Sequence, residues 1–116
     1  MTEEEESIRH STLHVIAFLA SVSEQRKFAA KVTYACYQDE FACWLDAVFV
    51  REDHKTPNMF NAKQIEVLKG FSDFFYETGS ELDEVPLTIE QLQSKIVWQK
   101  IVVRANEALA HFQDEN

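Results

Sequence analysis

The sequence predicts an all-α fold: a single-domain bundle of four or five helices around an aromatic-rich core. Only two Gly and two Pro occur among 116 residues, too few turn-forming residues for a set of β-hairpins or a sandwich. Apolar residues recur at spacings of three and four, the period of a helix, and 14 aromatic residues (nine Phe, three Tyr, two Trp) supply core volume. One core is expected at this length, so residues 1–116 form one domain with residues 1–3 and 113–116 frayed.

Two helices are expected in the first half of the chain. Glutamates at positions 3–6 place negative charge where a helix dipole favours it, and the apolar residues that follow predict a helix from about residue 4 to 21. The next stripe, at spacings of three and four, consists of Ala30, Tyr34, Tyr37, Phe41, Trp44 and Val48. Because this series is unbroken, it favours one long helix over residues 24–51. The polar run 38–40 leaves a kink or a new N-cap as the alternative.

The third helix is defined by its start. The polar stretch 51–58 contains a Thr-Pro pair and is predicted to be a loop, because a residue before proline disfavours helical conformation. Asn61 and Gln64 have the spacing of a capping box, which predicts a helix beginning after Asn61. Gly79 is a natural stop for it. Glycine inside a helix lowers its stability by about 1 kcal/mol relative to alanine. A close contact with another helix would explain why Gly70 occupies this position.

The last helix follows a second acidic loop over residues 80–87. Thr88 and Gln91 repeat the spacing of a capping box, so a helix is expected to start at residue 89. Its apolar stripe continues without a break and predicts an end near His111.

The two cysteines are expected to be free. Cys36 and Cys43 are seven residues apart in a predicted helix, which separates their Cα atoms by about 10 Å. A disulfide requires less than about 7 Å. Both are therefore expected to be small buried hydrophobes in a reducing compartment.

The chain is strongly acidic, with a formal net charge of −9 and a pI near 4.8. This argues against direct binding to nucleic-acid phosphates, which depends on clustered Lys and Arg. No stretch approaches the roughly 20 apolar residues of a membrane span. The acidic N-terminus is the opposite of a basic signal-peptide start, so a cytoplasmic location is expected.

The clearest functional signal lies between Lys69 and Lys95, where six acids occur without a base and four aromatic residues lie among them. A run of like charge destabilises the compact state unless it binds something positive, so a basic protein partner is expected. Four neighbouring aromatics cannot all face one core, and Tyr76 is expected to be partly exposed. The predicted partner-binding residues are Asp73, Tyr76, Glu77, Glu81, Asp83 and Glu84. A surface that serves only solubility is the alternative.

No catalytic, metal or cofactor motif stands out. His10 and His14 have the i, i+4 spacing of a bidentate metal site, but no third ligand lies near them in sequence. They are expected to be solvated surface residues. No phosphate-binding glycine loop and no nucleophile paired with a base is found. The sequence therefore predicts a non-catalytic protein without a metal or cofactor.

Three C-terminal stretches, Pro86 to Leu92, Trp98 to Ile101 and Ala105 to Phe112, have a characteristic spacing of Trp, Ile, Ala and Phe. In this spacing the segment resembles the C-terminal helices of small acidic immunity proteins from bacterial toxin-immunity systems, including those of contact-dependent growth inhibition. The resemblance implies a cytoplasmic helical protein that blocks a cognate toxin, commonly a basic nuclease. It implies no particular binding residues, because the helical members share no fixed binding motif.

Three other functions stay open. A phage-type nucleic-acid mimic that inhibits a defence nuclease would need carboxylates spaced like a phosphate backbone over a broad face. Six bases count against it: Arg26, Lys27, Lys31, Lys95, Lys100 and Arg104. A structural or regulatory module would self-associate through an exposed aromatic face. A metal protein or enzyme would use His10 and His14.

Overall fold

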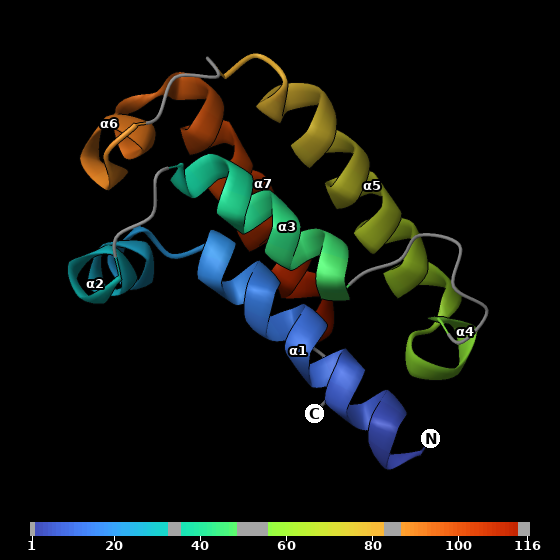
Figure 1. The fold of residues 1–116 in the computed structure, drawn as a ribbon. Coiled ribbons are helices and arrows are strands. Elements are labelled where there is room, and N and C mark those ends of the chain that lie inside the picture. The colour runs from blue at the N-terminus through green and yellow to red at the C-terminus, as the bar shows by residue number, and fades with distance from the viewer. Residues whose placement is uncertain (1, 33–35, 49–55, 83–86, 114–116) are drawn as a thin grey trace.

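The computed structural model describes residues 2–32, 36–48, 56–82 and 87–113. These residues contain helices and no strands (Figure 1), which confirms the all-α prediction. The helices are α1 (Glu3–Leu19), α2 (Val22–Lys31), α3 (Tyr37–Val48), α4 (Thr56–Met59), α5 (Ala62–Gly79), α6 (Ile89–Ser94) and α7 (Ile96–Gln113). Within the described part of the chain, no helix is both long and apolar enough to cross a membrane.

Helix α7 is the centre of the bundle. It packs against α5 and α1, and α3 packs against α1 (Figure 1). The short helix α6 closes one end together with α2, while α4 contacts α1 and α5 at the other end. Helices α3 and α5 have little backbone contact with each other, so large side chains fill the space between them.

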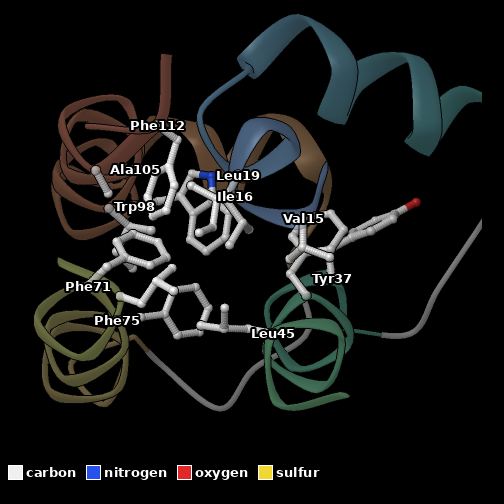
Figure 2. Close-up of a cluster of buried hydrophobic side chains, with 14 of the residues drawn as sticks. Val15, Ile16, Leu19, Tyr37, Leu45, Phe71, Phe75, Trp98, Ala105 and Phe112 are labelled. Atoms are coloured by element: carbon white, nitrogen blue, oxygen red, sulfur yellow. The ribbon is translucent and has the colours of Figure 1, made fainter. Parts of the chain in front are cut away.

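The core is aromatic, as predicted. Side chains from α1, α3, α5 and α7 converge in it (Figure 2). Phe41, Phe71 and Trp98 are almost completely buried. The ring of Trp98 lies 5.9 Å from that of Phe41 and 6.2 Å from that of Phe75. Such pairs stabilise a core beyond the area they bury.

The prediction of one long helix over residues 24–51 is wrong. Helix α2 ends at Lys31, and Val32 is extended (φ −133°, ψ 126°). Helices α2 and α3 point in different directions (Figure 1). A β-branched pair at positions 32 and 33 disfavours helix, and the Tyr37 hydroxyl donates a 3.1 Å hydrogen bond to the Val32 carbonyl. Tyr34, a member of the predicted stripe, lies outside the described residues.

The last predicted helix is also broken. Thr88 and Gln91 form the predicted capping box, and α6 starts at residue 89. Lys95 is extended (ψ 131°), however, so the segment divides into α6 and α7. Helix α7 continues to Gln113 and so passes the expected end near His111.

The remaining boundaries follow local signals. Thr2 caps α1, so the expected fraying of residues 2 and 3 is wrong, and α1 ends two residues early, at Leu19. The predicted loop 51–58 contains the start of α4, and its residues 51–55 lie outside the described part. The described residues therefore contain seven helical segments, where the sequence predicted four or five helices.

The capping box at Asn61 and Gln64 is present, and α5 ends at Gly79 as predicted. Gly79 does not adopt the left-handed conformation of a C-terminal stop, since no described glycine has a positive φ. The expected close helix contact at Gly70 is absent, because a Cβ placed there would meet no atom within 4 Å.

The open space at Gly70 makes a direct prediction. Gly70→Ala is expected to raise the free energy of unfolding by about 0.5–1 kcal/mol, because alanine loses less backbone entropy in a helix. Urea denaturation followed by circular dichroism measures the change. A destabilised variant would contradict the geometry at this position.

A buried hydrogen-bond network joins α2, near the start of the chain, to α6 and α7 near its end. Gln25 of α2 is completely buried, and its amide nitrogen donates to the carbonyls of Phe18 (3.2 Å) and Leu19 (3.0 Å). Its oxygen accepts from the indole N–H of Trp98 and from the amide of Gln93, both at 3.1 Å. The network therefore fixes α2 across the end of α1 and the start of α7.

Candidate functional site: an acidic surface between α3 and α5

A cavity of about 240 Å³ opens between α3, α5 and α7. Its floor includes Trp98 and Ile101, which belong to the buried core. Helix α3 contributes Asp39 and Ala42 to its wall, and α5 contributes Tyr76. The cavity thus combines an apolar floor with polar groups at its edge, the composition expected of a binding site.

Tyr76 connects the two walls. Its hydroxyl donates a hydrogen bond to the Asp46 carboxylate of α3. Its side chain is 40% exposed, as the sequence predicted, while Phe71 and Phe75 are buried. Partial burial, together with the hydrogen bond and the negative charge of Asp46, raises the pKa of Tyr76 above its ordinary value. Tyr76 therefore stays a neutral hydrogen-bond donor at physiological pH.

The predicted acids of α5 are close to this tyrosine in the chain. Asp73, half-buried, precedes Tyr76 by one turn, and exposed Glu77 follows it directly. Glu81 is exposed in the turn after the helix. The other two predicted residues, Asp83 and Glu84, lie outside the described residues.

Two further acids were missed in the sequence. Asp39 and Asp46 are exposed on α3. Asp46 accepts the hydrogen bond of Tyr76, and Asp39 lines the same cavity as Tyr76. Their spacing of seven residues places them on one helix face, a signal that was available in the sequence. Asp39 and Asp46 precede Tyr76 by 37 and 30 residues in the chain, so no local pattern links them to it. We call Asp39, Asp46, Asp73, Tyr76, Glu77 and Glu81 the acidic surface.

The cysteines only partly meet expectation. Both are free, and Cys36 is half-buried, with burial as the main cause that raises its pKa. Cys43 is exposed on α3, so its expected burial is wrong. Cys43 lies off the face of α3 that carries the buried residues Tyr37, Phe41 and Leu45.

The histidine pair lies on α1. His10 and His14 are both exposed, with ring centroids 6.4 Å apart. Within residues 2–32, 36–48, 56–82 and 87–113, no group of three His, Cys, Asp or Glu side chains is placed to hold a metal.

Fold and site together define a small helical domain with acids of α3 and α5 near a half-exposed tyrosine. Comparison of the chain with protein-family models, curated proteins and solved structures finds no match.

Proposed function

We propose that the chain is a non-catalytic immunity protein that neutralises a cationic cognate toxin, of the nuclease type, in the cytoplasm. The single observation that carries the proposal is the placement of acids from two helices around a half-exposed tyrosine. Like charges so close together oppose folding, and a cationic partner removes that cost. The acids would take the place of substrate phosphates on the toxin, without direct contact between this chain and nucleic acid.

In the acidic surface, the carboxylates and Tyr76 are expected to contribute to different rate constants of binding. Carboxylates mainly raise the association rate and make it sensitive to salt. An aromatic residue at the centre of an interface mainly slows dissociation. Tyr76 is suited to this role because its ring is already held by Asp46 and by an edge-on contact with Phe75, with ring centroids 5.6 Å apart.

The test is binding to the toxin encoded beside the gene of this chain, measured by surface plasmon resonance at low and high salt. Combining Asp46→Asn, Asp73→Asn and Glu77→Gln is expected to lower the association rate at least about tenfold at low salt. Tyr76→Ala is expected to raise the dissociation rate at least about tenfold, as for an interface hot spot.

The matched control removes three exposed acids elsewhere, by Glu24→Gln, Glu66→Gln and Glu90→Gln. It changes net charge equally and is expected to alter the association rate less than about threefold, because distant charges are screened. Equal effects of both triple variants would assign binding to net charge alone. An unchanged affinity after loss of Asp46, Asp73, Glu77 and Tyr76 would remove the site.

A further inference from the structure

A second surface, on α7, has no partner within the described chain. Its residues are spaced alternately four and three apart, and all are exposed: Ile96, Lys100, Val103, Glu107 and Ala110. This is the spacing of the seam residues in a coiled coil. We call these five residues the α7 seam.

The α7 seam is not part of the core. Helix α7 packs against α1 and α5 through buried residues at positions 98, 101, 105, 108 and 112, which lie on its opposite face. Ile96 is 69% exposed and Val103 is 57% exposed, the two highest values among the large apolar side chains described. Four seam residues, Ile96, Lys100, Val103 and Glu107, line an open hollow of about 340 Å³. Phe74 of α5 lines its other side, and the guanidinium of Arg104 of α7 lies 5.0 Å from the Phe74 ring.

We propose that the α7 seam binds a second copy of this chain, with the two α7 helices antiparallel. The charges select this occupant and this direction. With Val103 on the two-fold axis, Glu107 of one copy lies one residue, about 1.5 Å along the helix, from the position opposite Lys100 of the other, which is close enough for two ion pairs. A parallel pairing would place Lys100 against Lys100 and Glu107 against Glu107, which is repulsive.

The same axis aligns the apolar residues. Val103 meets Val103 of the second copy at the centre, and Ile96 meets Ala110. Because exposed ion pairs contribute little, the apolar contacts supply most of the affinity and the ion pairs supply direction. One helix from each copy makes a small interface, so a reversible dimer is expected.

The dimer is independent of toxin binding. Trp98 and Ile101, which line the floor of the cavity at the acidic surface, lie on the face of α7 opposite the seam. The α7 residues that line this cavity are therefore not those of the seam. The proposed axis differs from self-association through the aromatic face of α5, which the sequence left open.

Sedimentation equilibrium of the full chain over a wide concentration range tests the proposal. The wild type is expected to form a monomer–dimer equilibrium, and Val103→Asp is expected to raise the dimer dissociation constant at least about tenfold, because it buries an unpaired charge at the centre. Lys100→Glu or Glu107→Lys alone is also expected to weaken the dimer.

The decisive measurement mixes the two single charge variants. In a heterodimer of Lys100→Glu with Glu107→Lys, opposite charges again face each other at both positions, so the mixture is expected to associate more tightly than either variant alone. The double variant Lys100→Glu/Glu107→Lys is expected to return to within about twofold of wild type, since both pairs are restored.

Control variants change charge and polarity away from the seam. Lys63→Glu on α5 and Val22→Asp on α2 alter exposed residues of the same types and are expected to leave the dimer unchanged. A wild type that stays monomeric at all concentrations would overturn the proposal. So would a dimer that the seam variants do not weaken, or single charge variants that do not complement each other. Toxin binding by the seam variants is measured separately, so failure of one proposal leaves the other standing.

Discussion

Trp98→Ala is expected to lower the free energy of unfolding by about 3–5 kcal/mol, the usual cost of removing a buried aromatic side chain. Trp98 is 1% exposed and forms ring contacts with α3 and α5 through Phe41 and Phe75. Its loss leaves a cavity where three helices meet. Because a domain of this size is stable by about 5–15 kcal/mol, this loss removes a large share of its stability.

Urea denaturation measured by circular dichroism checks this result. Trp98→Phe keeps most of the ring and is expected to fold, so it preserves a measurable transition if the alanine variant does not. The control is Val22→Ala, at an apolar residue that is 41% exposed, with an expected change within about 0.5 kcal/mol. A loss below about 1 kcal/mol for Trp98→Ala would place this residue outside the core.

Gln25→Leu is expected to have the second largest effect and to lower the free energy of unfolding by about 2–4 kcal/mol. Leucine has a similar size but leaves two buried donors, the Trp98 indole N–H and the Gln93 amide, without their acceptor. The substitution also removes the hydrogen bond that the Gln25 amide donates to the Leu19 carbonyl at the end of α1. Each unsatisfied buried group costs about 1–3 kcal/mol, and leucine recovers only part of this as apolar contact.

Chemical denaturation of Gln25→Leu, Trp98→Phe and the double variant separates the stability lost with the hydrogen bonds from the stability lost with core packing. Since Trp98→Phe already removes one of the donors, the double variant is expected to be less destabilised than the sum of the single variants. Gln99→Leu is the matched control, at an exposed glutamine whose single hydrogen bond to the Gln93 carbonyl water can replace. Equal costs at positions 25 and 99 would contradict a structural role for the network.

The two proposed surfaces differ in what drives them. At the acidic surface, charge is concentrated and the aromatic contact is limited to Tyr76, which suits rapid capture of a strongly basic partner. At the α7 seam the apolar residues alternate with one base and one acid, which suits a self-complementary contact. Salt is therefore expected to weaken toxin binding much more than dimerisation.

The elements that were predicted correctly depend on short-range chemistry. The starts of α5 and α6 were found because a capping box joins residues only three apart, as at Asn61 and Gln64. Tyr76 was identified because four adjacent aromatics cannot share one face of a helix. The break between α2 and α3 was missed because an unbroken apolar stripe does not show where the chain changes direction.

The sequence by itself determined the helical class, the aromatic core and the acidity around Tyr76, since composition and local spacing carry these properties. Only the tertiary structure decided that Asp39 and Asp46 of α3 lie at the same surface, and that the polar side chain of Gln25 is buried. It also decided which face of α7 stays exposed. The physical reason is that these properties depend on contacts between residues far apart in the chain, which no local pattern records.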